Sequence, residues 1–507
     1  MHRTCAQIEQ VRHALTEMRW RWAVSVVATG ALAATVLAPA ASSSKATPPR
    51  HQGSGAIVSI DPAAAIAPPV PGDFLGLSFE AEDLNTLAGY GGSGEFVNLL
   101  RSLGSGVMRF GGISSDRNTA WLNEGTPPPW ASSTITPGDL AGLAGLARST
   151  GWHVLLGVNL GHFEPAAAAQ EAQVADTLLG PSLAGIAIGN EPDRYLADLL
   201  RPAGWSPAGY VAESEAYRAA IAAAAPGVPL LGPDASSGKA SLPWLTTVAA
   251  SERPSLLTYH YYPLTSCSRY KPKSSDLLSP LTRTHEQATL TALAVIAQTY
   301  ALPLRLDETN NISCRGQPGL SNTFSSALWA VDFIVRAMAS GVSGLNFHDL
   351  IADSQAYSPL VGGNEQELKD GVLHANPEWY ALLLARHLLG DQPIQEKVKS
   401  DNRNLTSAAF LSTSGRLHIV LVNFSSLGKP VSVSLRVPRD FGGGTILRLA
   451  APGLRATSQV TLGGSAVSAE GTWTPATSLP RLAGRAGSLK VEMPRASAAL
   501  VTLYPTS

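Results

Sequence analysis

Short apolar runs alternate with longer helical stretches along the chain from Phe74 onward, and each run becomes polar only near its C-terminal end. Runs that are apolar on both faces are typical of parallel strands covered by helices. Alanine-rich segments such as PGDLAGLAGLARST separate them. The strand-like runs are FLGLSFE, GVMRFGG, HVLLGVNL, LAGIAIGNE, VPLLGPD, LLTYHYYP, LPLRLDE and VSGLNFHD. This repetition predicts an α/β fold, a (β/α)8 TIM barrel over residues 73–388.

The pattern changes over residues 389–507, where alternating segments such as RLHIVLVNF and KPVSVSLRVP follow one another without helices. Glycine and serine separate these segments, which predicts an antiparallel β-sandwich as a second domain. Residues 56–72 begin with the strand-like run AIVSI, before the first barrel strand. This N-terminal strand is a candidate to cross over and join the sandwich.

The N-terminus has the features of an export signal. Arg19 and Arg21 precede an apolar run of about 15 residues, and Ala38-Pro39-Ala40 follows it, so residues 1–40 are predicted to be a cleaved signal peptide of a secreted protein. The long, mixed stretch before Met18 suggests that Met18 is the true start. A membrane anchor is the weaker alternative because a span needs about 20 apolar residues. The polar, proline-rich residues 41–55 are predicted to be a disordered linker.

Three cysteines are present, and Cys5 would leave with the signal peptide. Cys267 and Cys314 then remain as an even pair in an oxidising compartment, which predicts a disulfide between them. Two unpaired buried thiols are the alternative.

The charge of the chain excludes some partners. Its 507 residues carry a formal net charge of -1 at pH 7, which gives no general field for nucleic acid or anionic polymers. The histidines have no HExxH spacing and no phosphate-binding glycine loop follows a strand, so neither a metal nor an organic cofactor is expected.

Polar residues at the strand ends indicate the site, because the C-terminal ends of barrel strands carry the active site in this architecture. These residues are Glu80, Arg109, Asn159, Glu191, Asp234, His260, Glu308 and His348. Glu191 follows the fourth strand and Glu308 the seventh, which face each other across the mouth. Hydrolysis of a glycoside with retention needs such a pair about 5 to 5.5 Å apart. Repulsion between the two charges raises the pKa of the acid. Asn190, beside Glu191, can bind a sugar hydroxyl next to the reacting carbon.

The sixth run, LTYHYYP, adds two candidates. The period of two places His260 and Tyr262 on one face and Tyr261 on the other. Tyr262 is expected to donate to Glu308 and keep it ionised. His260 either does the same or fills the barrel as a structural histidine.

The motifs GNEP, RLDETNNISC, MRFGG and TYHYYP together resemble the retaining glycosidases built on (β/α)8 barrels. The run from ETNNISCRGQPGLSNTFSSALWAVDFI through GLNFHD to ANPEWYALLLA resembles more closely glycoside hydrolase family 79, the β-glucuronidase and heparanase group. The resemblance implies that Glu191 is the acid/base and Glu308 the nucleophile.

The same resemblance implies that Glu80 and Asp116 hold sugar hydroxyls and that Asn190 and His348 line the pocket. Glu82 and Asp83 are rivals for the role of Glu80. Asp116 is equally explained as a turn or cap residue beside Ser115.

The loop after Glu308 is the first place to look for donors to a glucuronate carboxylate. Strict glucuronidases of this family present a tyrosine and backbone amides in the loop after the nucleophile, whereas this loop reads TNNISCRGQPG without tyrosine. Ser313, Arg315 or the amides near Gly316 are candidate donors, and a plain surface charge is the alternative for Arg315. Further candidates from the sixth loop are Arg269, Tyr270 and Lys271. A disulfide between Cys267 and Cys314 would tie these two loops together.

The expected function is therefore a secreted, retaining, exo-acting β-glucuronidase whose substrate is a glycan or a small glucuronide. A xylosidase or arabinosidase of the same barrel clan is the first alternative. A heparanase-like endo-glucuronidase is less favoured because the chain has no clustered lysines and arginines to follow a sulfated polymer. A non-catalytic carbohydrate-binding protein is the remaining alternative. The sequence leaves the oligomeric state open.

Overall fold

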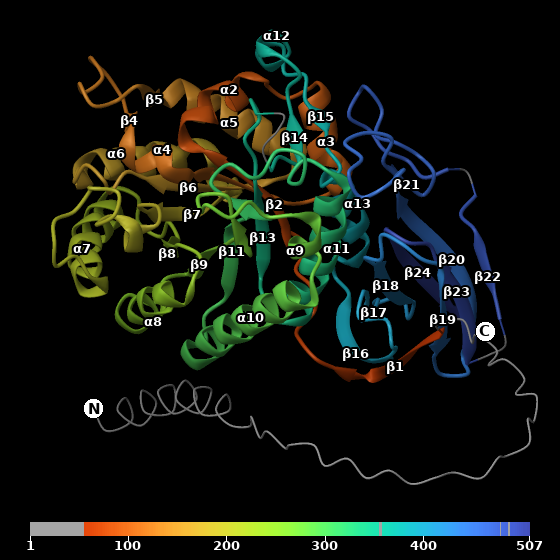
Figure 1. The fold of residues 1–507 in the computed structure, drawn as a ribbon. Helices are drawn as coiled ribbons and strands as arrows, with labels where there is room; N and C mark the ends of the chain where they lie inside the picture. Colours follow the sequence, from red (N-terminus) through yellow and green to blue (C-terminus); the bar gives the residue numbers. More distant parts are fainter. Residues whose placement is uncertain (1–54, 354–356, 477, 485–486, 507) are drawn as a thin grey trace, which may run out of the picture. The chain divides into compact units, whose positions relative to one another are not determined.

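The computed structural model describes residues 55–353, 357–476, 478–484 and 487–506 (Figure 1). The predicted signal peptide, the proposed start at Met18 and the linker up to residue 54 lie outside the described residues. Gly55, the last residue of that predicted linker, begins the first strand. Within the described ranges no helix is long and apolar enough to cross a membrane.

Eight parallel strands form a closed barrel, which confirms the predicted fold class. Each of the eight predicted runs supplies one strand, and β13 pairs with β2 to close the barrel. Alternation sends Leu75, Leu77 and Phe79 of the first barrel strand outward into the hydrophobic core. The residues between them therefore face the barrel interior. The strands are β2 (Leu75–Glu80), β3 (Val107–Gly111), β6 (His153–Val158), β7 (Leu183–Ile188), β8 (Leu230–Ala235), β9 (Leu256–Tyr261), β11 (Leu304–Thr309) and β13 (Gly344–His348).

Helices cover the outside of the barrel, and several begin at residues that cap them well. Thr136 and Asp139 form a capping box ahead of α5, and Ser206 and Ser279 cap α7 and α10, which satisfies backbone N–H groups that lack helical partners. The longer helices are α3 (Glu95–Leu103), α5 (Pro137–Thr150), α6 (Pro165–Leu179), α7 (Pro207–Ala224), α8 (Leu242–Ser251), α10 (Pro280–Tyr300) and α11 (Phe324–Ala339). The shorter ones are α2 (Leu84–Gly89), α4 (Gly112–Arg117), α9 (Ser274–Leu277), α12 (Glu365–Lys369) and α13 (Trp379–Ala385).

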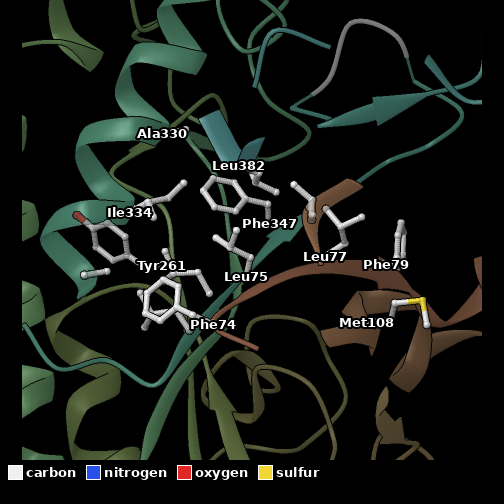
Figure 2. Packing of buried hydrophobic residues seen from close by; sticks show 14 of the residues in the cluster. Phe74, Leu75, Leu77, Phe79, Met108, Tyr261, Ala330, Ile334, Phe347 and Leu382 are labelled. Carbon is white, nitrogen blue, oxygen red and sulfur yellow. The ribbon is translucent and has the colours of Figure 1, made fainter. Parts of the chain in front are cut away.

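The helix α11 is buried along almost its whole length. Figure 2 shows Ile334 of this helix and Leu382 of α13 in one cluster with Leu75 and Phe347 of the neighbouring strands β2 and β13. On its other side, α11 contacts the second domain, where Thr406 donates a hydrogen bond of 2.6 Å to its Asp332. This helix therefore packs in the barrel's core and also contacts the sandwich.

The second region is an antiparallel β-sandwich formed by one ten-stranded sheet, and it has a core of its own. The N-terminal strand β1 (Gly55–Ala65) lies inside this sheet, antiparallel to β16 and parallel to β19. Val58 and Ile60 of β1 are buried in the sandwich core. The other strands are β16 (Gln392–Lys399), β17 (Leu405–Leu411), β18 (Leu417–Asn423), β19 (Val431–Arg436), β20 (Phe441–Ala450), β21 (Thr461–Leu462), β22 (Arg481–Ala483), β23 (Ser488–Met493) and β24 (Ser497–Pro505).

Candidate active site

The candidate site lies where the barrel strands end. Because all eight strands are parallel, their carboxyl ends meet at one mouth.

A β-bulge in β11 brings Glu308 into the site. Arg305 pairs with Thr258 of β9, but the next matched pair is Glu308 with His260, so β11 holds one residue more than its neighbour over this interval. Successive side chains of a regular strand point to opposite faces. If Asp307 faces the barrel interior, Glu308 would therefore point away from the interior. The extra residue re-aims the strand, and both carboxylates are buried inside the barrel.

Glu191 reaches the site from a turn rather than from a strand. The strand β7 ends at Ile188, so the predicted strand is three residues too long. Glu191 has the left-handed φ of 48° and its N–H donates to the carbonyl of Asp234 at 3.0 Å. A non-glycine residue in this region is strained and persists only when its surroundings hold it. Here the strain aims a carboxylate at the barrel mouth.

The two glutamates are close enough to act on one bond. One carboxylate oxygen of Glu191, one of Glu308 and a ring nitrogen of His260 all lie within 4.8 Å of one another. This separation fits the spacing of about 5 to 5.5 Å that accompanies retention and is shorter than the about 6.5 to 9.5 Å of inverting pairs.

Glu308 is surrounded by donors and cations. Arg109 Nη1 donates to its Oε2 at 2.7 Å, and the hydroxyl of Tyr262 donates to its Oε1 at 2.9 Å. The Nδ1 atoms of His260 and His348 lie 3.7 Å and 3.9 Å from Oε2. Burial alone would raise the pKa of Glu308, but these cations and the phenol outweigh it and hold that pKa well below its usual range. Glu308 is therefore an ionised carboxylate. The sequence predicted that Tyr262 donates a hydrogen bond to it, and the structure contains this bond.

Glu191 has the opposite character. Burial raises the pKa of Glu191, and the charge of Glu308 adds to the rise, against the hydrogen bond and charge of His260. The Nδ1 atom of His260 lies 3.1 Å from Glu191 Oε1. The side chain of Glu191 is 23% exposed and that of Glu308 only 10%, so the more protonated carboxyl is also the more accessible one.

His260 connects the two carboxylates. Burial lowers its pKa, but the charge of Glu308 and the hydrogen bond to Glu191 outweigh this and raise the pKa to about 9. The ring is fully buried and its closest contact among the two glutamates is with Glu191. His260 was expected either to bond directly to Glu308 or to fill the barrel. In the structure its hydrogen bond goes to Glu191, and its positive charge lies between the two glutamates.

Arg109 is the central residue that the sequence named only as a polar strand end. It is 1% exposed, and its Nη2 donates to Asn190 Oδ1 at 2.7 Å and to Asp234 Oδ2 at 2.9 Å. Its Nε lies 3.5 Å from Asp307 Oδ2. The sequence signal for this role is a single cation within the apolar run VMRFG. An arginine buried on a barrel strand needs several hydrogen-bond acceptors around it. Its bond to Asn190 also fixes the orientation of that amide.

Two groups of side chains have the spacing of metal ligands: Glu191 with His260 and Glu308, and Asp234 with His260 and Asp307. The guanidinium of Arg109 forms ion pairs with Asp234, Asp307 and Glu308. It supplies the positive charge that these carboxylates require and would repel a metal ion there. The absence of a metal in the mechanism stays a prediction.

His348 lies between Glu308 and Glu80, with one ring nitrogen near each carboxylate. Ser114 donates to Glu80 Oε2 from its N–H at 2.9 Å and from its hydroxyl at 2.5 Å, and His348 Nε2 is 3.5 Å from Glu80 Oε1. Burial raises the pKa of Glu80, but these bonds and the histidine outweigh it, so the net direction is downward. Of its rivals, Glu82 is exposed and binds Asn118. Burial beside Glu80 raises the pKa of Asp83 to about 7.

Asp116 lies in α4, directly after the second barrel strand, as predicted. It is 1% exposed and accepts hydrogen bonds from the backbone N–H groups of Leu160, Gly161 and Asn190 and from the hydroxyl of Tyr195. These four donors occupy both carboxylate oxygens. The structure therefore supports the alternative of a turn residue, because Asp116 holds the turn that carries Asn190. Contact of Asp116 with sugar hydroxyls stays a prediction.

The predicted disulfide between Cys267 and Cys314 is present, with 5.8 Å between the Cα atoms. It joins the loops after β9 and β11, where β10 (Leu264–Thr265) and β12 (Ile312–Ser313) pair in parallel. The carbonyl of Ser313 accepts from Ser266. Arg315 lies at the exposed rim and its Nη2 is 3.1 Å from Asp353 Oδ2.

A tyrosine reaches the site from a loop that the sequence did not suggest. Tyr357 follows β13, is 5% exposed, and its ring lies 5.6 Å from that of Tyr262 and 5.9 Å from that of His348. The tyrosine missing from the loop after Glu308 thus has a counterpart in the loop after the eighth strand. Its sequence context, SQAYSP, carries no motif that would identify it.

No family model matches the chain. One curated protein, a β-glucuronidase of Neurospora crassa, is 46% identical over 48 residues, a stretch that covers 10% of this chain and only 9% of that protein.

Solved structures are similar over most of the chain. A 4-O-α-L-rhamnosyl-β-D-glucuronidase from Fusarium oxysporum 12S has a TM-score of 0.71 and 17% identity, covering 88% of this chain and 100% of that one. A family 51 arabinofuranosidase from Xanthomonas axonopodis pv. citri has a TM-score of 0.65 and 13% identity, covering 89% and 100%. A family 51 α-L-arabinofuranosidase from Bifidobacterium longum has a TM-score of 0.66 and 15% identity, with the same coverage. At these identities the comparisons establish that the barrel and sandwich fold is shared.

Proposed function

We propose that this protein is a retaining glycoside hydrolase, an exo-acting β-glucuronidase of the family 79 type. The observation that carries the proposal is the pair Glu191 and Glu308, whose oxygens lie within 4.8 Å while their pKa values shift in opposite directions. Two carboxyls with environments that separate their pKa values are the basis for assigning an acid and a nucleophile.

In this mechanism Glu308 attacks the anomeric carbon as Glu191 protonates the leaving oxygen, so the glycosidic C–O bond breaks and a glycosyl ester forms. Glu191, now ionised, then takes a proton from water, and the resulting attack on the same carbon releases the sugar and restores Glu308. Arg109 and Tyr262 hold the two oxygens of Glu308 and keep its attacking geometry. His260 stabilises the negative charge that moves between the two glutamates.

The sugar is proposed to be glucuronate because candidate donors gather on one side of Glu308. The ring of Tyr357 packs beside those of Tyr262 and His348, and its backbone adjoins Gly316, next to Arg315 with its cation. A carboxylate is best bound by such charge-assisted donors. The glucuronidases of Fusarium oxysporum and Neurospora crassa support the same substrate class.

A neutral sugar is the second candidate, with activity on arabinofuranosides. Two observations favour it: arabinofuranosidases share the fold, and Asp353 already pairs with Arg315. Glucuronate would have to compete with Asp353 for that guanidinium. A heparanase-like endo-glucuronidase and a non-catalytic carbohydrate-binding protein have less support, the latter because both glutamates are in place.

The test compares hydrolysis of the 4-nitrophenyl β-glucuronide, β-glucoside, β-xyloside and α-L-arabinofuranoside by the wild-type protein. We expect kcat/KM for the glucuronide to exceed the others by about 100-fold, since a paired carboxylate is worth about 2–3 kcal/mol. No preference for the glucuronide would reject the substrate, and no turnover of any would reject the enzyme. The Glu308→Gln variant should lose hydrolysis and keep the melting temperature of the wild type. With the wild-type protein, NMR of the sugar first released from a β-glucuronide should show the β-anomer.

Secretion is part of the proposal and rests on the sequence of residues 1–40 alone. N-terminal sequencing of the protein recovered from culture medium tests it. A first residue close to Ala41 supports cleavage, whereas retention of the protein inside the cell contradicts export.

A further inference from the structure

The leaving group must lie on the side of Glu191. This residue donates the proton to the leaving oxygen in the proposed mechanism, and its side chain is more than twice as exposed as that of Glu308. The residues that extend outward from Glu191 are therefore the first that a leaving group, the aglycone, would meet.

Two arginines and one aspartate extend outward from Glu191. Arg194 Nε lies 3.5 Å from Glu191 Oε2 and 3.7 Å from Asp198 Oδ2. Arg117 Nη2 lies 2.9 Å from the other carboxylate oxygen of Asp198, Oδ1. The side chains of Arg194 and Arg117 are 50% and 44% exposed. Ion pairs this exposed contribute little to stability, but they hold the guanidinium of Arg194 beside the acid and link that of Arg117 to it through Asp198.

An aromatic pair continues the same row. The carbonyl of Arg117 lies 3.4 Å from His162 Nε2, and the His162 ring stacks on Trp130 with centroids 3.8 Å apart and an angle of 8°. Trp130 belongs to the segment between β4 (Thr119–Trp121) and β5 (Ser133–Ile135), which pair in parallel. The N–H of Ser132 also donates to the carbonyl of Asn118 at 2.9 Å. The indole is thus held on a supported segment.

We propose that this row, from Arg194 through Arg117 to Trp130, is a binding site for a saccharide aglycone. The inference rests on the proposed hydrolase function and adds the chemistry of the leaving group. Guanidinium N–H groups bind the hydroxyls of the first sugar beyond the cleaved bond, and the indole, stacked on His162 by one face, offers its other face to the apolar C–H side of a second sugar. The order of the row, polar beside the acid and aromatic farther out, matches a short glycan.

An apolar aglycone is the competing occupant. Leu196 and Leu199 lie in the same loop as Arg194 and are 50% and 90% exposed. Because charged side chains rather than these leucines directly adjoin Glu191, the structure favours a sugar in the first position. The two occupants predict different responses to substitution.

The experiment uses three substrates of increasing length: 4-nitrophenyl β-glucuronide, glucuronosyl-β-(1→4)-glucose and glucuronosyl-β-(1→4)-cellobiose. Arg117→Ala should lower kcat/KM for both saccharides relative to the aryl compound, and Trp130→Ala should lower it for the trisaccharide by about tenfold, the upper range for an aromatic contact. Tyr504→Ala, a part-exposed aromatic of the sandwich beside Arg416, is the matched control and should change none of the three.

Equal losses on all three substrates, or no loss on the trisaccharide, would overturn the proposal. A selective loss on the aryl glucuronide in Leu199→Asp would show that an apolar aglycone occupies the site instead. A second measurement separates this inference from the proposed substrate: cellobiose binding, followed by tryptophan fluorescence, should weaken at least fivefold in Trp130→Ala. Unchanged binding would reject the saccharide site even if the glucuronide is hydrolysed, and weakened binding would support it even if the glucuronide is not.

Discussion

Arg109 and Glu308, from strands on different sides of the barrel, are joined by a hydrogen bond of 2.7 Å between Nη1 and Oε2. The same guanidinium binds Asn190 and Asp234 through Nη2. One buried cation therefore sets the position of the proposed nucleophile and of the amide beside the proposed acid. A planar fork can do this, whereas the single ammonium group of lysine cannot reach all three partners.

Arg109→Lys keeps the positive charge and loses this fork. We expect kcat to fall by about 100-fold or more, comparable to the loss of one donor to a reacting group, with a smaller effect on KM. Steady-state kinetics on an aryl β-glucuronide, or on the best substrate found, measures both constants. A melting temperature within a few degrees of wild type shows that the fold is retained, and kcat within threefold of wild type would contradict the assigned role.

His260→Gln removes the cation that bridges the two glutamates. The positive charge of His260 lowers the pKa of both Glu308 and Glu191, so its loss raises both values. Activity requires ionised Glu308 and protonated Glu191, and both limbs of the kcat/KM profile should therefore move to higher pH.

Tyr262→Phe is the matched comparison, because this hydroxyl contacts Glu308 at 2.9 Å. Its loss raises the pKa of Glu308, so the acid limb should move to higher pH by about one unit, as expected for one hydrogen bond to a charged group. The alkaline limb should stay in place. If His260→Gln moves only the acid limb, as Tyr262→Phe does, His260 does not influence Glu191.

The barrel could be predicted from the sequence because apolar runs and polar strand ends are local patterns, repeated often enough to outweigh an error in any one of them. The strand ends also predicted correctly that Glu191, Glu308, His260 and His348 gather at one mouth. Periodicity could not reveal the bulge in β11, since an inserted residue leaves no local signature, yet this bulge lets Asp307 and Glu308 both face inward.

Two other features were beyond the sequence for related reasons. Asp116 follows the expected glycines, but its role depends on four donors from two separate segments, 160–161 and 190–195. Tyr357 reaches the site through contacts with Tyr262 and His348, which are distant from it in the chain or on another element. Local patterns predict which strand end a residue occupies, whereas the partners of its side chain depend on segments distant in the chain.

The disulfide is expected to support substrate binding more than chemistry. Cys267 and Cys314 are separated by 47 residues, and closing such a loop is worth up to about 4 kcal/mol in the chain-entropy description. Cys314 and Arg315 both have left-handed φ values, 64° and 65°, which the tie helps to hold. Replacing both cysteines with serine should raise KM several-fold, change kcat less, and lower the melting temperature. A KM equal to wild type would show that the rim does not contribute to binding.

Glu171 is a buried carboxyl outside the site whose ionisation opposes folding. It is 4% exposed, and its Oε1 has no hydrogen-bond partner among the described residues. Burial raises its pKa from 4.5 to about 8. Because the folded value lies above the unfolded one, the carboxyl costs nothing below about pH 4.5, costs progressively more as the pH rises, and costs the full amount above about pH 8.

Glu171→Gln removes this titration while keeping the shape of the side chain. The full pKa difference corresponds to about 5 kcal/mol. The adjoining cavity of about 10 Å³ has room for about one water molecule, whose hydrogen bond to Glu171 would lower the effect, so we expect stabilisation by about 2 kcal/mol at pH 8.5. Urea unfolding at pH 4.5 and 8.5 measures the difference, with exposed Glu124→Gln as control. Equal effects at the two pH values would mean that Glu171 is already ionised at low cost, solvated by water entering beside Thr119 and Trp121.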